Sequence, residues 1–176
     1  MKWWRAAGLA VVVAGAGGAA WWRFGAALSR RAGAAELALR WRGSYAGSVT
    51  LPATLNWCPV THIGLLQGMS GDSGFAVVVY ERDALSSGPR SLVAPDVAPT
   101  IARPTATAAF RWLRIAPDTA VAGFRADGGV LRLQLTNGTA SGDVNAHMRS
   151  ATSNDTLIVQ GTFRGVPVVT TARGCT

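Results

Sequence analysis

The chain has 176 residues, of which 49% are hydrophobic and 15% charged, and its formal net charge at pH 7 is +8. Such an apolar composition is not that of a disordered chain. The positive charge does not indicate a nucleic-acid-binding protein. Five of the 17 basic residues fall within residues 1–31, where there is no acidic residue, and the remaining 12 are scattered singly among nine acidic residues. A nucleic-acid-binding surface would group them with stacking aromatic side chains, so we expect no nucleic-acid partner.

The amino-terminal residues have the pattern of one membrane-spanning helix. An uncharged run, residues 6–20, lies between two tryptophan pairs with adjoining arginines, namely Trp3, Trp4 and Arg5 before it and Trp21, Trp22 and Arg23 after it. A helix from the first pair to the last would be about 30 Å long, the thickness of a hydrocarbon core. Tryptophan and arginine favour the headgroup boundary. We therefore expect residues 1–31 to be a membrane anchor and basic juxtamembrane segment in contact with lipid.

A cleaved secretory signal is the alternative for the same residues. Lys2 and Arg5 would supply its basic region, and residues 14–16 or 18–20 its small-residue cleavage site. The bulky Trp21 and Trp22 favour an uncleaved anchor instead. Basic residues flank the apolar run on both sides, so the positive-inside rule does not choose an orientation.

The two cysteines, Cys58 and Cys175, stand near the beginning and the end of residues 32–176. A disulfide between them would close this part of the chain on itself and implies an oxidising compartment such as a periplasm. Two unrelated buried thiols are the alternative. The bias toward arginine over lysine, with abundant Ala and Gly, is typical of GC-rich bacterial genomes. We therefore expect a single-pass protein of a bacterial inner membrane with residues 32–176 in the periplasm.

Residues 32–176 are expected to form one β-rich domain. Leu37, Leu39 and Trp41 alternate with polar or small residues, which predicts a half-buried strand at 36–42 followed by a hairpin to residues 45–51. Further strands are expected at 75–81, 106–115 (with a short helix as the alternative), 130–135, 141–149, 156–164 and 166–172, with a turn at Asn137-Gly138 and a proline-rich loop or edge strand at 86–104. Seven or so short strands predict an all-β fold: a sandwich, a curved sheet or a barrel.

A protease-like motif occurs at Gly71-Asp72-Ser73-Gly74. Nucleophilic catalysis by Ser73 needs a base within hydrogen-bond reach and an acid that orients the base. Trypsin-like proteases have glycine at the next position, where this chain has Phe75, and His62 lies too close upstream for the order of residues in that family. We expect a glycine-rich turn before a strand.

Metal and cofactor motifs are equally weak. Cys58 and His62 have helical spacing, but Pro59 argues against a helix there, and no second ligand pair follows. The acidic residues include no close pair, and the glycines form no phosphate-binding loop. No histidine lies between Trp3 and Trp22 to ligate a haem or a chlorophyll. We expect no metal, no cofactor and no catalytic residue, and therefore not an enzyme.

One series of short motifs resembles a known family. After the apolar segment come Gly43-Ser-Tyr-Ala-Gly47, Leu55-Asn56-Trp57 and Leu65-Leu66-Gln67-Gly68, and then a β-branched strand. Over residues 37–80 this order is similar to that of type II secretion system protein N. The resemblance implies a periplasmic, non-enzymatic β-rich accessory of a membrane assembly.

Together these features predict a non-catalytic, single-span accessory subunit of a larger inner-membrane complex, whether secretory, respiratory or photosynthetic, with other membrane proteins as partners. Residues 86–104, Arg111 and Arg114 are the candidate contact residues. The alternative is a periplasmic β-domain that carries a lipid or another hydrophobic ligand in a large apolar cavity.

Overall fold

A computed structural model describes residues 35–114, 120–171 and 175. The expected anchor, with its tryptophans and arginines, and the expected boundary between residues 31 and 32 lie outside the described residues. Within the described residues, no helix is long and apolar enough to cross a membrane.

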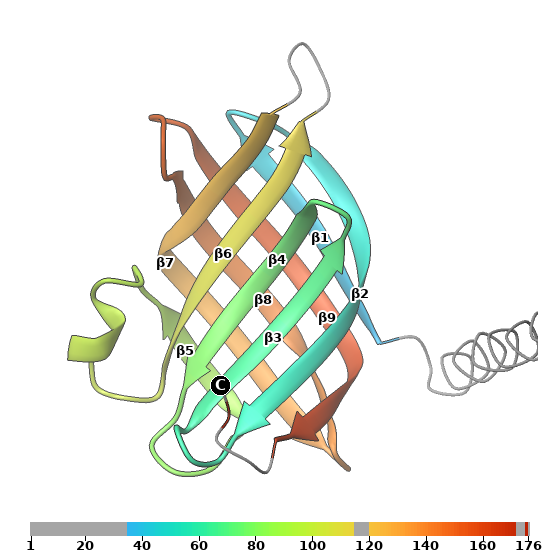
Figure 1. Cartoon of the computed structure of the whole chain (residues 1–176), viewed down its shortest axis with the longest axis vertical. Coiled ribbons are helices and arrows are strands. Elements are labelled where there is room, and N and C mark those ends of the chain that lie inside the picture. Colours follow the sequence, from blue (N-terminus) through green and yellow to red (C-terminus); the bar gives the residue numbers. More distant parts are fainter. Residues whose placement is uncertain (1–34, 115–119, 172–174, 176) are drawn as a thin grey trace, which may run out of the picture. The chain divides into compact units, whose positions relative to one another are not determined.

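The described residues form nine β-strands and one short 3-10 helix, and the strands close into a barrel in the order β1-β2-β3-β4-β6-β5-β7-β8-β9 (Figure 1). The elements are β1 (Glu36–Gly43), β2 (Gly47–Cys58), β3 (Ile63–Ser70), β4 (Ser73–Tyr80), β5 (Gly88–Leu92), η1 (Ala98–Thr100), β6 (Thr105–Arg114), β7 (Ala120–Thr136), β8 (Thr139–Ser150) and β9 (Thr156–Thr170). The all-β prediction is confirmed, and among the arrangements left open by the sequence the strand pairing is that of a closed barrel.

Side chains fill the interior of the barrel. Alternate residues of each strand point inward, as in β1, where Leu37, Leu39 and Trp41 are buried and their neighbours are exposed. Phe75 and Phe163 are each fully buried as well. The apolar alternation in the sequence therefore reports the inner face of a packed barrel.

The predicted hairpins are confirmed. Asn137 and Gly138 join β7 to β8 with φ values of 50° and 75°, the left-handed conformations that a two-residue hairpin turn requires. At the β1–β2 hairpin, Gly47 lies under the ring of Trp41, where a Cβ atom would stand 2.4 Å from Cζ2. Glycine at this position lets the indole ring pack against the backbone.

The strand predictions need several corrections. Residues 156–164 and 166–172 were expected to be two strands, but β9 is one strand with a register irregularity opposite residues 140–142 of β8. The strand β3 and the first half of β7 were not predicted. The strand β5 lies within residues 86–104, which were expected to be a loop or an edge strand, and it pairs with a strand on each side. The glycines of these strands and Pro89 lower the local strand propensity, and burial in the closed sheet compensates for that loss.

Two strands, β1 and β5, separate longer neighbouring strands over part of their length. The strand β1 lies between β2 and β9, which pair directly with each other only at residues 55–57 and 168–170. In the same way β5 lies between β6 and β7, which pair directly at residues 109–114 and 120–125. Each inserted strand therefore adds one strand to the barrel wall over part of the height of the barrel.

Aromatic rings close one end of the barrel, called the aromatic end below, where β1, β3 and β8 finish. Phe110 is the centre of the cluster, with ring centroids 5.0 Å from Trp41, 6.2 Å from Trp112, 6.3 Å from Phe124 and 6.5 Å from Phe75. Trp41 and Trp112 are 4.7 Å apart. Phe110 and Trp112 are stacked and the other pairs are tilted, and both arrangements are favourable for aromatic rings at these distances.

The opposite end carries the longer connections and is called the tied end. It includes the β2–β3 turn, residues 81–87, residues 93–104, Thr171 and Cys175. Figure 1 shows residues 93–104 standing out beside the barrel next to β5. The side chain of Leu85 is packed against the core, so residues 81–87 cover this end of the barrel.

Candidate interaction surface

A buried ion pair holds residues 81–87 over the tied end. Arg90 and Glu81 are only 2% and 3% exposed. The Arg90 Nε donates to Glu81 Oε1 at 2.9 Å, and the guanidinium also donates to the carbonyl oxygens of Ser86 and Gly88. The Ser86 hydroxyl donates to the other Glu81 carboxylate oxygen. Each charge is thus paired and hydrogen-bonded, which is the condition for burying it.

Residues 93–104, called the lobe, leave the barrel wall after β5 and return to it at β6. Inside the lobe, the amides of Val97 and Ala98 donate to the Ala94 carbonyl at 3.0 and 3.1 Å, and the Thr100 amide donates to the Val97 carbonyl at 2.9 Å. Ala98 is 3% exposed, whereas Val97 and Ile101 are 40% and 38% exposed. The lobe therefore presents two apolar side chains on an internally bonded backbone.

Both ends of the lobe are fastened to the barrel. At its start the Val93 amide donates to the Ala106 carbonyl at 2.9 Å. At its end Arg103 donates to the Glu81 carbonyl at 3.1 Å and lies 5.7 Å from the centroid of the Tyr80 ring, and Arg82 donates to the Arg103 carbonyl. The lobe is thus linked to the same segment that the buried ion pair holds.

The disulfide prediction is confirmed. Cys58 and Cys175 are bonded, with their Cα atoms 5.5 Å apart and a sequence separation of 117. Cys58 ends β2 beside the parallel β2–β9 pairing, and the Thr171 amide donates to the Trp57 carbonyl at 3.0 Å. The disulfide therefore fastens the carboxyl-terminal residues to the tied end, and Cys58 has no thiolate to offer a metal.

The residues of the protease-like motif have structural contacts. Ser73 begins β4 after a tight turn, and its Oγ accepts a hydrogen bond from the Leu113 amide at 3.0 Å. His62 lies in the β2–β3 turn with a φ of 58°, and its Nδ1 contacts the Arg82 carbonyl. The two residues stand at opposite ends of antiparallel β3 and β4. The expected glycine-rich turn is confirmed.

The candidate contact residues lie in different places. Residues 86–104 contain β5 and the lobe at the tied end. Arg111 is exposed near the aromatic end and lies 3.6 Å from Asp72. The side chain of Arg114 lies outside the described residues. The structure does not bring Arg111 together with the lobe.

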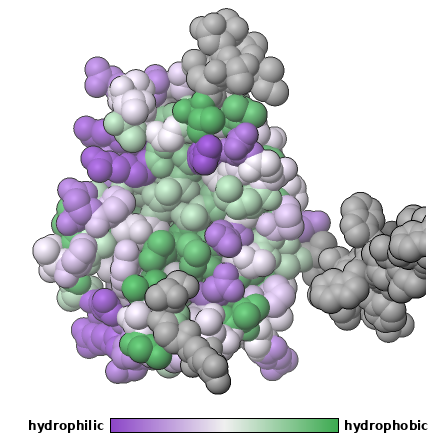
Figure 2. Space-filling model, in the orientation of Figure 1, coloured by the Kyte–Doolittle hydropathy of each residue, from purple (hydrophilic) through white to green (hydrophobic). Residues whose placement is uncertain are grey.

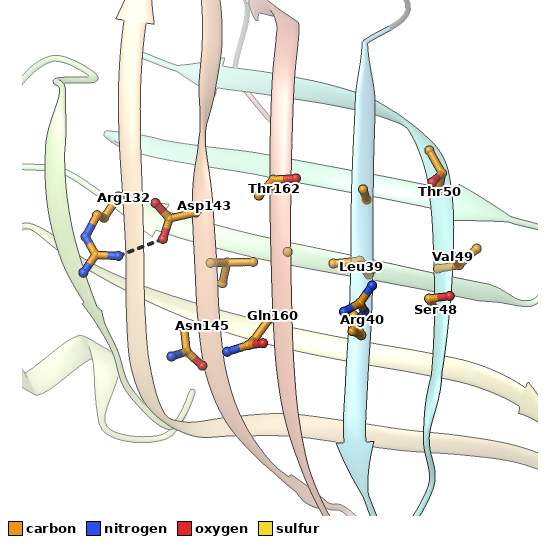
Figure 3. A pocket seen from close by; sticks show the side chains of 13 residues that line it. Leu39, Arg40, Ser48, Val49, Thr50, Arg132, Asp143, Asn145, Gln160 and Thr162 are labelled. Carbon is orange, nitrogen blue, oxygen red and sulfur yellow. Dashed lines mark hydrogen bonds and ion pairs between the residues drawn. The ribbon is translucent and has the colours of Figure 1, made fainter.

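A shallow polar hollow of about 860 Å³ lies on the outer wall over β1, β2, β7, β8 and β9 (Figure 3). Arg132 and Asp143 form an ion pair of 2.8 Å at its edge. The amides of Asn145 and Gln160 lie side by side, and Asn145 Oδ1 is buried without a hydrogen-bond partner. The lining residues include no histidine or cysteine, and the hollow is a feature of the wall between long outward side chains.

Glu81, Arg90 and Arg103 were not found from the sequence. Glu81 begins a run of three charged residues, and Arg90 and Arg103 lie within the proline-rich residues 86–104, with no motif that links the three. The only local signal was that Glu81 directly follows the apolar run of β4. Their association is produced by the insertion of β5 into the wall beside β6.

No protein-family model, no curated protein and no solved structure matches this chain.

Proposed function

We propose that this protein is a non-catalytic accessory subunit of a bacterial inner-membrane complex, anchored by one amino-terminal span, with residues 32–176 in the periplasm. The tied end contacts the other membrane proteins through the lobe. The proposal combines the anchor expected at Trp3–Trp22 with the surface that the barrel presents.

The observation that carries the proposal is the exposure of Val97 and Ile101 on an ordered, doubly fastened lobe. Exposed apolar side chains on a pre-organised backbone lose little conformational entropy when they are covered by a partner. Loops held on a rigid scaffold are also the usual position of binding residues. The buried ion pair and the disulfide keep this scaffold rigid at the tied end.

The family resemblance supports the same class of function, although the motifs that carry it have packing roles here. Gly47 lies against the Trp41 ring, and a Cβ on Gly68 would stand 3.0 Å from the Leu51 Cβ. Leu55 and Leu66 are buried in the core. These residues account for the barrel, whereas the proposed contact surface is the lobe, outside residues 37–80.

The experiment is to isolate the full chain with a carboxyl-terminal tag from its native bacterium in mild detergent and to identify by mass spectrometry what co-migrates on a native gel. We expect a stoichiometric set of membrane proteins. A protein that migrates alone would contradict the proposal.

Two variants test the lobe itself. The Val97→Asp/Ile101→Asp variant should no longer co-migrate with the membrane proteins, because two carboxylates would have to be desolvated at the interface. The matched control is Val121→Asp, since Val121 is 46% exposed but stands at the aromatic end. Loss of the partners in the control and not in the lobe variant would move the contact surface to the opposite end.

A hydrophobic-ligand carrier is the second function considered from the sequence, and it needs a large apolar cavity. The inward side chains of this barrel fill its interior, and Leu37, Leu55, Phe75, Phe110 and Leu131 are each at most 1% exposed. The packed interior therefore favours the accessory subunit.

A further inference from the structure

The outer wall of the barrel has two faces of different chemistry. Outward positions are those that alternate with buried residues along each strand. On β3 and β4 they carry no charge: Ile63, Leu65, Gln67, Met69, Gly74, Ala76, Val78 and Tyr80. On β1, β8 and β9 the outward positions include Glu36, Arg40, Arg42, Asp143, Arg149 and Arg164. We call the first of these the β3–β4 face.

The β3–β4 face is continuous across neighbouring strands. Leu65 is paired with Val78 on one side and with Asn56 on the other, and Asn56 is paired with Val169. Val169 is 50% exposed, and Met69, at the aromatic end of the same face, is 47% exposed. Figure 2 looks onto this side of the barrel and shows mostly white and green side chains over its middle, with a few purple ones among them and larger purple groups along one border. A contiguous apolar face of this kind marks a contact with protein or membrane.

Arginines stand at the borders of the β3–β4 face. Arg103 lies over the ring of Tyr80, the last outward residue of β4, and Arg82 follows two residues later in the chain. Arg111 is paired across strands with Gly74 near the aromatic end. Arginine side chains at the edge of an apolar surface can reach phosphate groups while the centre of the surface is in contact with acyl chains. Arg111 lies 3.6 Å from Asp72, and Asp83 directly follows Arg82, so these borders carry three arginines and two aspartates and are positive by one charge. A positive border is attracted by anionic lipid headgroups.

The chain enters the barrel wall close to this face. The Ala35 carbonyl accepts a hydrogen bond of 2.8 Å from the Ala53 amide, and Ala53 on β2 is paired with Gly68 on β3. Between Trp22 and Ala35 the sequence has only residues 23–34. The last tryptophan of the anchor expected from the sequence is therefore separated by twelve residues from Ala35, which directly precedes the first strand.

We propose that the β3–β4 face lies against the surface of the membrane, with Leu65 and Val78 at the acyl-chain boundary and Arg82 and Arg103 at anionic phosphates. The inference rests on the proposed membrane anchor and adds an orientation to it. The charged wall of β1, β8 and β9 then faces the aqueous side, and the lobe extends sideways along the membrane toward neighbouring proteins.

The test uses the full chain in vesicles of phosphatidylcholine and phosphatidylglycerol. An environment-sensitive fluorophore is attached to Leu65→Cys on the β3–β4 face or to Thr162→Cys, the control on the charged wall, with the Cys58–Cys175 disulfide kept oxidised. Lipids carrying a nitroxide on the acyl chain are then added. We expect the label at position 65 to be quenched roughly two-fold or more relative to the label at position 162, since a surface-bound apolar face enters only the headgroup and upper acyl region.

The outcomes separate this inference from the proposed function. A chain that fails to float with the vesicles contradicts the membrane anchor and, with it, both proposals. A chain that floats with equal quenching at the two positions contradicts only the orientation. Protection of position 65 in the isolated native complex without quenching in vesicles also contradicts it, and assigns the face to a partner protein.

A second variant checks that the apolar side chains cause the contact. In Ile63→Asp/Val78→Asp the quenching of the label at position 65 should fall to the level of position 162, while the chain still floats. The matched pair Thr50→Asp/Gln160→Asp, at the polar hollow over β2 and β9, should leave the quenching unchanged. Quenching that persists in the first variant would overturn the proposal.

Discussion

At the aromatic end the barrel is closed by rings that pack against one another, whereas at the tied end it is closed by a charged pair and a covalent bond. Around Phe110 the interactions are many and non-directional, so each ring shares its surroundings with several others. Around Arg90 they are few and directional, since one guanidinium holds Glu81 and two backbone carbonyls. A directional network fixes the positions of loops as well as closing the barrel.

The two kinds of interaction correspond to the connections between strands at the two ends of the barrel. The described turns of the aromatic end are short, and the turns after β1 and β8 are joined by hydrogen bonds from the Tyr45 hydroxyl to Asp155 Oδ2 and from the Thr156 amide to the Ser44 hydroxyl, each at 3.2 Å. The tied end carries residues 81–87 and the lobe, which cannot bury enough apolar surface to order themselves. Arg90, Arg103 and the disulfide supply that order, and the tied end can therefore present Val97 and Ile101 in a fixed position.

The largest effect is expected from Phe110→Ala at the aromatic end. A buried phenylalanine truncated to alanine costs about 3–5 kcal/mol, and each aromatic pair that the truncation breaks adds about 0.5–1.5 kcal/mol. The free energy of unfolding, measured with urea on the oxidised protein, should fall by at least the cost of the truncation, about 3–5 kcal/mol. Phe110→Leu, which keeps most of the volume, should be destabilised much less. Equal destabilisation of the two variants would contradict a role for ring–ring packing.

A comparable loss of stability is expected from Arg90→Met at the tied end, and a second substitution should restore much of it. Removing one partner leaves Glu81 buried and unpaired, which costs about 3–5 kcal/mol. The double variant Glu81→Leu/Arg90→Met removes the unpaired charge and should recover a large part of the stability. A double variant as unstable as the single one would show that the hydrogen bonds to Ser86 and Gly88, and not the charge, hold the loop.

The disulfide should contribute a smaller amount. The closed loop spans 117 residues, and loss of a native disulfide costs about 2–5 kcal/mol. The free energy of unfolding of Cys58→Ala/Cys175→Ala is compared with that of the parent protein, each with and without a reducing agent. The reducing agent should destabilise the parent and leave the variant unchanged. Destabilisation of the variant by the reducing agent would contradict this assignment.

The smallest effect is expected from Arg132→Ala on the outer wall. Arg132 pairs with Asp143 at 2.8 Å, but the two side chains are 60% and 41% exposed. Exposed ion pairs contribute about 0–1 kcal/mol because water screens them. The change in urea midpoint should be close to the error of the measurement. A destabilisation as large as that of Arg90→Met would contradict the distinction between buried and exposed pairs.

Much of the fold was predictable from local pattern. The alternation of Leu37, Leu39 and Trp41 gave the inner face of β1, and Asn137-Gly138 gave the β7–β8 turn, because both depend on neighbouring residues alone. The strand β3 was missed because its two glycines lower the propensity, while its inward positions are buried only once β2 and β4 lie on either side of it.

The candidate surface was predictable only in part. The prolines of residues 86–104 indicated an irregular segment, and the two cysteines allowed a disulfide. The pairing of Arg90 with Glu81 depends on β5 entering the wall between β6 and β7, a long-range event with no local signal. The contrast between the β3–β4 face and the charged wall likewise exists only when the barrel closes.

By itself the sequence determined the all-β class, most strand positions, the inward side chains and the turn at Asn137-Gly138. These follow from the two-residue period of a strand and from backbone preferences, which act over a few residues. Tertiary structure decided the closed barrel, the continuous β9, the buried Arg90–Glu81 pair and the two chemical faces of the wall. Each of these joins residues far apart in the chain, and only the burial gained when the sheet closes on itself selects them.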